Sequence, residues 1–345
     1  MTSARKAAGN LHERIATQPA EFDDILSWVV WLYYADQLTQ NEIARVLGVS
    51  RASIVKLLQE ARERGLVTIR INTESASRTR MARALVERFG LAAATVIPSI
   101  QGASLTKRLG DAGARVLADQ ARPGDVIGVA WGRTVLAVAR SVLLPEGIAN
   151  LTVVQLTGSS AGGTADFSPE LCSSLLAGRL MARCVNLVAP AVLSTPELRD
   201  RLLEEPVLVK QFALIRSATR VLFGVGDLAP SGTVRQSELA GKEVIDGYVE
   251  RGAVGALIGR FIDAGGRAVS GELDCRMVGL TLDELLAMPV RLCVAGGAEK
   301  ITAIRAALRG GFVTHLVTDT ETGEALLRDT TRLRITRGAS SRRPA

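Results

Sequence analysis

The chain has 345 residues, of which 47% are hydrophobic and 22% are charged, so a single small module and a disordered polymer are both excluded. The net charge is +7, but residues 328–345 hold six arginines against one aspartate, so the overall charge alone does not indicate nucleic-acid binding. No apolar stretch approaches the roughly 20 residues that span a bilayer, and residues 1–20 lack the apolar core of a signal peptide. We therefore expect a cytoplasmic protein with no membrane association.

Cysteine and histidine are too sparse to suggest a metal site. The four cysteines include no C-x-x-C pair, and reduced, buried thiols are the better interpretation. His12 and His315 are the only histidines. A zinc enzyme is therefore not expected, and we predict neither a metal nor another cofactor.

Residues 21–64 contain three helical patterns. Over residues 24–34, apolar side chains recur at the spacing of one helix face. Thr39 and Glu42 form a capping box that predicts the start of a second, short helix. Gly48 breaks that helix, and Ser50 is a good N-cap for a third helix that runs to about Arg64. The order of helix, tight turn and helix predicts a helix-turn-helix.

The third helix is predicted to bind DNA. Ala44, Gly48, Ile54 and Leu57 stand where two crossing helices must touch without bulk. The charge also changes sign, from three bases and six acids in residues 1–44 to six bases and two acids in residues 45–70. A three-helix domain whose charges only solvate a face is the alternative, but it does not explain this combination. The expected contacts to double-stranded operator DNA are cations, short polar groups and methyl groups. They are Thr39, Gln40, Ser50, Arg51, Ala52, Ser53, Val55, Lys56 and Gln59.

A wing and a linker are expected to follow. Residues 66–71 (LVTIRI) predict the strand of a wing, beside which Arg64 and Arg70 would reach phosphate. Residues 72–80 are polar, and Met81, Leu85 and Phe89 then recur at helical spacing. A short connecting helix is therefore predicted before Gly90.

From residue 91 to about residue 319, β-branched runs alternate with helical patterns. The runs are residues 95–98, 126–130, 151–156, 185–188, 220–225, 291–295 and 315–317. Such alternation predicts an α/β, Rossmann-like domain with a parallel sheet covered by helices. Because ligands bind such sheets at the carboxyl ends of the strands, the loops after these runs are the candidate binding loops.

Two of these loops predict an anion site. Gly132, Arg133 and Thr134 open a helix after one run, and free N–H groups at a helix N-terminus favour an anion. Gly296 and Gly297 follow another run, with Lys300 one turn later. Glycine at a strand-to-helix turn is as often a sign of tight packing, but the two loops together favour a phosphate site.

A third loop, residues 156–162, matches the G-x-S-x-G pattern of a nucleophile elbow, with Ser160 and His315 as triad members. An elbow needs a helix directly after its serine, and here more glycines follow. A hydrolase is therefore not favoured, and Gly158 and Ser159 are interpreted as effector contacts.

Two acids remain open. Asp263 and Asp274 could each accept hydrogen bonds from sugar hydroxyls, although a turn-forming Asp beside Gly is the commoner explanation. Asp263 is kept as a candidate effector contact.

With both halves considered, the chain resembles the SorC/DeoR type of sugar-responsive bacterial transcriptional regulators over nearly all of residues 24–328. The residues that carry the resemblance form five blocks, of which the last ones are more specific than the helix-turn-helix. The blocks are residues 38–44 with 47–50, residues 128–134, residues 252–255, residues 278–281, and residues 294–297 with Lys300.

The resemblance implies an effector domain similar to sugar-phosphate isomerases and glucosamine-phosphate deaminases, which acts as a sensor without catalysis. By position, Gly132, Arg133 and Thr134 look like the family's phosphate loop, and Lys300 looks like its second phosphate contact. The resemblance also suggests a tetramer.

The predicted function is a DNA-binding transcriptional regulator, a repressor rather than an activator, of a carbohydrate or polyol catabolic operon. A phosphorylated sugar or sugar alcohol would control it. Because one helix contacts too few base pairs for specificity, we expect a homo-oligomer, either a dimer or a tetramer. The alternatives are an active sugar-phosphate isomerase or deaminase with a DNA-binding appendix, whose base would be Asp263 or Asp274, and constitutive DNA binding with a dead ligand pocket.

The expected organisation has five parts. Residues 1–20 form a flexible arm, residues 21–72 a winged helix-turn-helix domain and residues 73–90 a linker helix. Residues 91–330 form the effector-binding and oligomerisation domain, and residues 331–345 form a basic tail.

Overall fold

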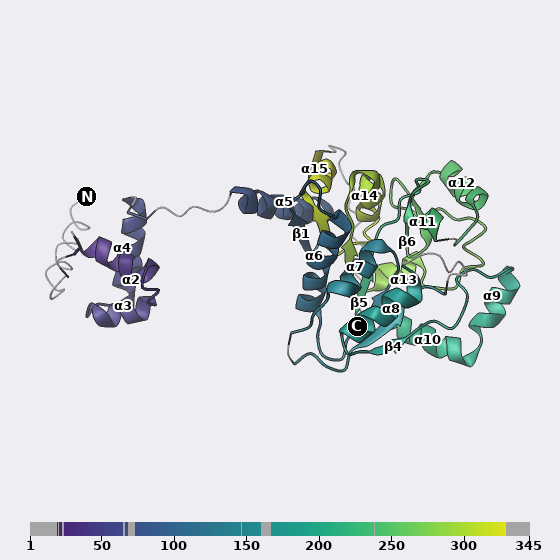
Figure 1. Ribbon diagram of the computed structural model, residues 1–345, viewed down its shortest axis with the longest axis horizontal. Coiled ribbons are helices and arrows are strands. Elements are labelled where there is room, and N and C mark those ends of the chain that lie inside the picture. The colour runs from purple at the N-terminus through teal and green to yellow at the C-terminus, as the bar shows by residue number, and fades with distance from the viewer. Residues whose placement is uncertain are drawn as a thin grey trace, which may run out of the picture. The chain divides into compact units, whose positions relative to one another are not determined.

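The computed structural model describes residues 19, 21–22, 24–64, 66–67, 73–145, 147–159, 167–237 and 239–328 (Figure 1). The chain divides into two compact units, Met1–Thr73 and Glu74–Ala345, and each unit is described by itself. The predicted arm, most of the predicted wing and the basic tail lie outside the described residues. Leu66 and Val67 are described and are not part of a strand.

The described residues of the smaller unit before Thr73 form three helices, α2 (Ile25–Tyr34), α3 (Gln40–Val46) and α4 (Arg51–Glu63). Their apolar faces form one core, in which Ile43 and Ile54 are fully buried. Gly48 turns the chain between α3 and α4 with φ +64°, a conformation that glycine adopts without steric cost. The predicted helix-turn-helix is therefore confirmed.

Side-chain caps fix the start of each of these helices. Asp24 accepts a hydrogen bond from the Ser27 N–H at the start of α2, and Ser50 caps α4 through the Ser53 N–H. The predicted capping box begins α3, because Thr39 Oγ1 accepts from the Glu42 N–H (3.3 Å) and the Glu42 carboxylate accepts from the Thr39 N–H (2.8 Å).

Replacing Thr39 with alanine should lower the free energy of unfolding of the smaller unit by about 1 kcal/mol, because the α3 N–H group loses its partner. Urea unfolding followed by the fluorescence of Trp28 and Trp31, in a Trp131→Phe background, measures this change. Thr39→Ser keeps the acceptor and is the control. Equal stabilities of the alanine and serine variants would contradict the capping role.

The larger unit starts at the second residue of α5 (Thr73–Phe89) and is built on a seven-stranded parallel sheet. The strand order across the sheet is β1-β9-β8-β5-β2-β3-β4. The strands are β1 (Ala93–Ile97), β2 (Val126–Val129), β3 (Thr152–Gln155), β4 (Arg183–Val185), β5 (Arg220–Phe223), β8 (Val290–Val294) and β9 (His315–Asp319). The predicted parallel sheet is therefore confirmed.

Helices cover both faces of the sheet, so successive strand residues enter different cores. Leu222 of β5 belongs to one core, whereas its neighbours Val221 and Phe223 belong to the other. The first core contains α6 (Leu105–Gln120), α7 (Arg133–Ser141) and α8 (Pro169–Arg179). The second contains α5, α10 (Pro206–Arg216), α13 (Leu282–Ala287), α14 (Ile301–Arg309) and α15 (Thr320–Arg328). Because both faces are covered, the middle of a central strand such as β5 is apolar at successive positions rather than at alternate ones.

A smaller layer lies beside the second core. It contains the antiparallel hairpin β6 (Ala253–Leu257) and β7 (Arg260–Asp263), together with α11 (Thr233–Gln236) and α12 (Lys242–Glu250). Helix α9 (Pro196–Leu203) precedes α10, and the 3₁₀ turn η1 (Ala298–Lys300) precedes α14. Hydrogen bonds join the backbones of Gly226 and Ala256 in both directions (2.9 Å each), so the hairpin is tied to the loop that follows β5.

The chain reverses its direction across the sheet between β2 and β5. Strands β3 and β4 follow β2 on one side, and β5 then returns to the other side of β2. Loops leaving such a switch point diverge over opposite faces and open a crevice at the carboxyl ends of the strands. The loops after β2 and β5 are therefore placed to form a binding site.

Some bounds differ from the prediction. Strand β4 ends at Val185, where residues 185–188 were predicted, because the chain leaves the sheet there and the Val188 N–H donates to Gln211 instead. Helix α5, by contrast, lies within the bounds 73–90 expected for the linker helix, and its residue Leu85 is fully buried in the core of the larger unit. The hairpin β6–β7 was not predicted.

Candidate functional site

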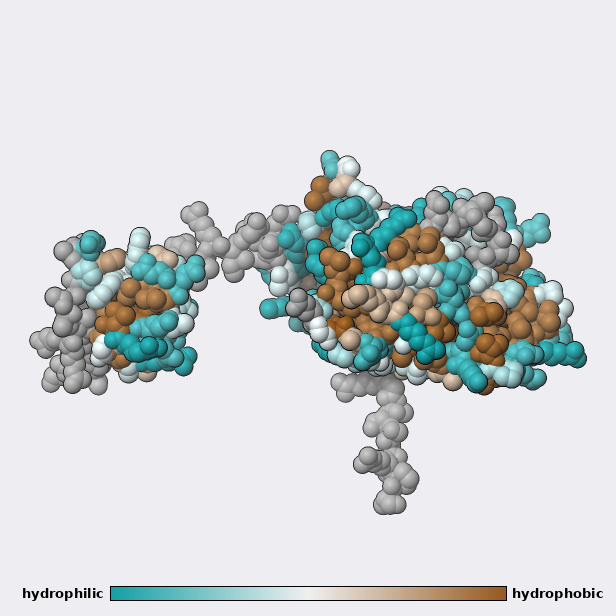
Figure 2. Space-filling model, turned by 60° about the horizontal axis from the view of Figure 1, so that its bottom comes forward, coloured by the Kyte–Doolittle hydropathy of each residue, from teal (hydrophilic) through white to brown (hydrophobic). Residues whose placement is uncertain are grey.

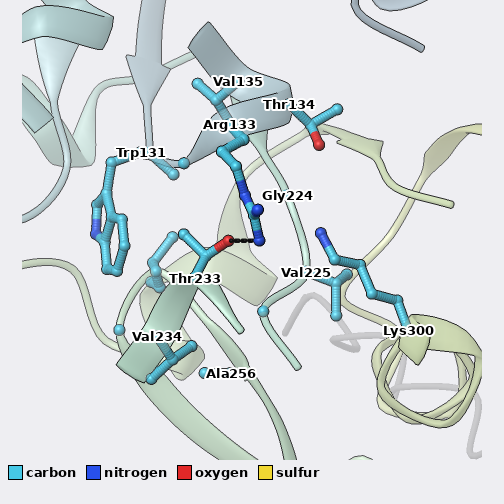
Figure 3. A pocket seen from close by; sticks show the side chains of 15 residues that line it. Trp131, Arg133, Thr134, Val135, Gly224, Val225, Thr233, Val234, Ala256 and Lys300 are labelled. Carbon is cyan, nitrogen blue, oxygen red and sulfur yellow. Dashed lines mark hydrogen bonds between the residues drawn. The ribbon is translucent and has the colours of Figure 1, made fainter. Parts of the chain in front are cut away.

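A pocket opens at the switch point of the sheet (Figure 3). Its lining comes from four parts of the chain that are far apart in sequence. They are residues 130–135 after β2, residues 224–226 after β5 with Thr233 and Val234 of α11, the hairpin residues Ala256, Ile258 and Gly259, and Lys300.

The N-terminus of α7 forms one wall of the pocket. Gly132 is the N-cap residue, with φ +124°, and no side chain caps this helix. The first N–H groups of α7 therefore keep their capacity to bind a ligand, and the helix dipole favours an anion there. Thr134, in the first turn, is buried and lines the same pocket. Gly132, Arg133 and Thr134 thus all line the pocket, and their role as effector contacts stays a prediction.

Two cations face the pocket from opposite sides, Arg133 from α7 and Lys300 from the turn before α14 (Figure 3). Burial lowers the pKa of Lys300 and nearby Arg133 lowers it further, whereas Asp227 and Glu299 oppose the shift. Arg133 Nη2 donates to Thr233 Oγ1 (3.3 Å) and to the Ser231 carbonyl oxygen (3.4 Å). Both hydrogen bonds are long, so a phosphate oxygen would compete well for this guanidinium.

The hairpin tip supplies a strained apolar wall. Ile258 and Gly259 join β6 to β7 with φ +48° and φ +84°. A β-branched residue rarely adopts positive φ, and such strain is found mainly at ligand sites and switches. Ile258 is nevertheless buried and lines the pocket.

The loop before α14 contributes differently from the prediction. The Gly297 N–H already donates to Asp319 Oδ2 (3.2 Å) and Thr322 Oγ1 (2.9 Å), and a Cβ on Gly296 would collide with the Asp319 carboxylate. Gly296 therefore permits close packing against Asp319, and Gly297 adopts φ +105°, a conformation that favours glycine. Tight packing is the alternative that the sequence left open. Lys300 is the member of this loop that lines the pocket.

The two acids considered above lie outside the pocket lining. Asp263 is at the end of the hairpin opposite Ile258 and accepts hydrogen bonds from the N–H groups of Gly265 (2.9 Å) and Arg267 (2.8 Å). Asp263 therefore stabilises a turn, which is the alternative to an effector contact that the sequence left open. Asp274 accepts from the Tyr248 hydroxyl (2.6 Å) and the Gly271 N–H (2.8 Å), and it pairs with Arg260 (3.3 Å). Asp274 is thus part of a structural network.

Gly158 and Ser159, the two predicted effector contacts of the 156–162 loop, are described by the structure. The Gly158 N–H donates to the Val278 carbonyl oxygen and the Ser159 N–H to the Ala189 carbonyl oxygen, so both residues are held by backbone bonds. Gly158 shares a small cavity with Trp131, whose ring also lines the main pocket. Ser160 lies outside the described residues. His315 is the first residue of β9, at the opposite end of the sheet from the strand ends that carry these loops, which argues against a triad.

Sequence reasoning did not select several residues of the pocket. Gly224 and Gly226 follow β5 in the same way that Gly132 follows β2, so the rule of strand carboxyl ends could have found them. Thr233 and Ile258 carry no comparable signal, because they reach the pocket only through the tertiary fold. Trp131 stacks on Phe167, with ring centroids 6.5 Å apart, and its fluorescence can report on the pocket.

The predicted DNA contacts lie at the start of α3 and along α4. Of the nine, Gln40 and Ser53 are partly buried, and the other seven are exposed: Thr39, Ser50, Arg51, Ala52, Val55, Lys56 and Gln59. Gln40 Oε1 accepts a hydrogen bond from Arg51 Nε (3.3 Å), which joins the first residues of α3 and α4. The opposite face of α4 is buried against α2 and α3.

Within the described part of the chain, the helices are all too short or too polar to cross a membrane. The same residues contain no group of three or more His, Cys, Asp or Glu side chains that could hold a metal ion.

Comparisons with known proteins agree with this division of the chain. Residues 74–328 match the family described as "Putative sugar-binding domain", and residues 29–76 match the MarR family. The transcriptional regulator YjhU of Escherichia coli K12 is 33% identical over 88% of this chain and 94% of its own length. The transcriptional regulator LsrR of Klebsiella pneumoniae is 31% identical over 88% of this chain and 93% of its own. The crystal structure of the sorbitol operon regulator SorC from Klebsiella pneumoniae has a TM-score of 0.70 and 28% identity, and covers 89% of this chain and 99% of its own.

Proposed function

Because the chain belongs to the SorC/DeoR type of sugar-responsive bacterial transcriptional regulators, we propose that its pocket binds a phosphorylated sugar or sugar alcohol. Binding would change the affinity of the helix-turn-helix for operator DNA. A ligand can do this only by binding the DNA-competent and DNA-incompetent forms with different affinities. The protein would act in the cytoplasm as a repressor of a carbohydrate or polyol catabolic operon.

One observation carries the proposal that the ligand is phosphorylated. The uncapped N-terminus of α7, Arg133 and Lys300 all face one pocket at the switch point of the sheet. A neutral sugar has no need of two cations and a positive helix end, whereas a phosphate dianion uses all three.

The experiment that tests this proposal compares matched ligands in thermal unfolding of the full chain. The pairs are sorbitol with sorbitol 6-phosphate and ribose with ribose 5-phosphate. We expect only phosphorylated members to stabilise the protein, by about 2.7 kcal/mol when the ligand is present at 100 times its Kd. Equal stabilisation by the unphosphorylated members would contradict the proposal.

We also propose that the pocket senses its ligand without transforming it. Asp263 and Asp274, the two acids that could have served as a general base, have hydrogen-bond partners elsewhere in the fold. Turnover of any of these sugar phosphates by the purified protein would favour the alternative of a live isomerase or deaminase.

Self-association is part of the proposal, since a single recognition helix reads too few base pairs. One face of the larger unit carries apolar patches between polar areas (Figure 2). The large apolar side chains that this unit leaves exposed include Leu143, Met181, Val188, Val207 and Val209. These side chains support pairing between copies of the chain, as a dimer or a tetramer.

A further inference from the structure

A second, more open cavity adjoins the pocket along the outer face of α7. It is a groove between the start of α6, the exposed face of α7 and α11. Residues from all three helices, with Phe167, line it: Ser104, Thr106, Lys107, Arg133, Leu136, Ala137, Arg140, Ser141, Phe167 and Gln236. Arg133 lines both the groove and the pocket, so this residue stands between the two.

The walls of the groove are rigid. Helices α6 and α7 pack side by side (Figure 1), and a Cβ on Gly110 of α6 would collide with Ala137 of α7. This close approach fixes Leu136 and Ala137 as an apolar floor. Arg133 and Arg140 are seven residues apart, so they project from the same face of α7 at the two ends of this floor. Since a helix rises about 1.5 Å per residue, their Cα atoms lie roughly 10 Å apart.

The groove carries more positive than negative charge. Lys107 pairs with Asp111 (3.2 Å), which also accepts a hydrogen bond from Ser141 (2.7 Å). Arg133 and Arg140 have no carboxylate partner among the described residues. Both arginine side chains are exposed and border the same cavity. Among the described residues that line the groove, three are cations and none is an acid, which favours an anionic ligand group.

We propose that the effector carries a second acidic group, which binds beside Arg140 in this groove while the phosphate occupies the pocket. This inference rests on the proposed function, because it assumes that the phosphate lies between Arg133 and Lys300. The ligand is then an elongated, sugar-sized chain with an acidic group at each end, such as a phosphorylated sugar acid, and it passes Arg133. A simple polyol phosphate would fill only one of the two cavities.

Matched ligand pairs test this inference in the full chain. Each pair differs only in a carboxylate that replaces the terminal CH₂OH group. The pairs are sorbitol 6-phosphate with 6-phosphogluconate, ribitol 5-phosphate with 5-phosphoribonate, and erythritol 4-phosphate with 4-phosphoerythronate. For at least one pair, calorimetric titration should give a Kd about tenfold lower for the acid, as one charge-assisted hydrogen bond supplies.

Arg140→Gln should reduce that ratio of Kd values to about one. Lys210→Gln removes an exposed charge from α10, outside the groove, and should keep the tenfold ratio. Equal affinities within all three pairs would overturn the inference, and so would a ratio that survives Arg140→Gln. If the protein binds the polyol phosphates and the corresponding phosphorylated acids with equal affinity, only this inference fails. If no phosphorylated ligand of these pairs or of the sugar panel binds, the proposed function fails as well.

Discussion

Replacing Lys300 with methionine should raise the Kd of the phosphorylated effector about 10- to 100-fold. This range corresponds to the loss of one charged hydrogen bond, worth about 1.5–3 kcal/mol. Methionine keeps the length and the apolar packing of the side chain, so the loss reports on charge. Burial already lowers the pKa of Lys300, which means that its charged form is poorly solvated and gains from a phosphate partner.

The control for this variant is Lys242→Met. Lys242 is 85% exposed and pairs with Asp246 on α12 (3.2 Å), and a surface ion pair of this kind contributes little. Calorimetric titration of both variants with the best phosphorylated ligand gives the comparison. A Lys300→Met protein that binds with wild-type affinity would remove Lys300 from the site.

Arg51→Ala should weaken binding to the operator about 10- to 100-fold while leaving the fold intact. Arg51 is the first residue of α4, and its exposed guanidinium is oriented by the hydrogen bond to Gln40 (3.3 Å). A guanidinium held at the start of a recognition helix is placed to contact a guanine edge, which contributes about 1–3 kcal/mol. Fluorescence anisotropy with an operator selected from randomised duplexes measures the change.

Two comparisons separate a base contact from general electrostatics. Arg51→Ala should have a much smaller effect on binding to scrambled DNA, because the loss of a base contact weakens binding only to the operator sequence. The loss of a phosphate contact would weaken binding to all sequences alike. Arg62→Ala changes an exposed arginine in the last turn of the same helix and should affect operator and scrambled DNA equally. Equal losses for Arg51→Ala on both DNAs would assign Arg51 to phosphate binding instead.

Local rules were sufficient for much of the fold and for the wall of the pocket that α7 forms. A capping box, a turn glycine and an N-cap serine predict the helix-turn-helix because each acts within four residues of its partner. The loop at Gly132 was predicted for the same reason, since a strand run, a glycine and a helix follow one another directly. The walls that the loop after β5 and the hairpin form depend on which strand lies beside β2, and that order is a tertiary property.

The features that the sequence did not predict, or predicted in the wrong role, also depend on tertiary contacts. The hairpin β6–β7 turns at Ile258 and Gly259, which lack the Asn-Gly signature of a two-residue turn. Gly296 is explained by Asp319, a partner 23 residues away that no spacing rule connects to it. A glycine fitted to a carboxylate and a glycine that contacts phosphate look alike in sequence.

Occupancy of the pocket should set the affinity of the chain for operator DNA. The most direct test titrates the best phosphorylated ligand into a complex of the full chain with labelled operator, while anisotropy reports DNA binding. We predict at least a tenfold change in operator Kd and, because coupling is reciprocal, a ligand Kd of the DNA complex that differs from that of the free protein by the same factor. In Lys300→Met the midpoint of the titration should move by the factor by which that variant's ligand Kd rises. An operator Kd that stays constant at saturating ligand, with pocket occupancy verified by Trp131 fluorescence, would contradict the claim.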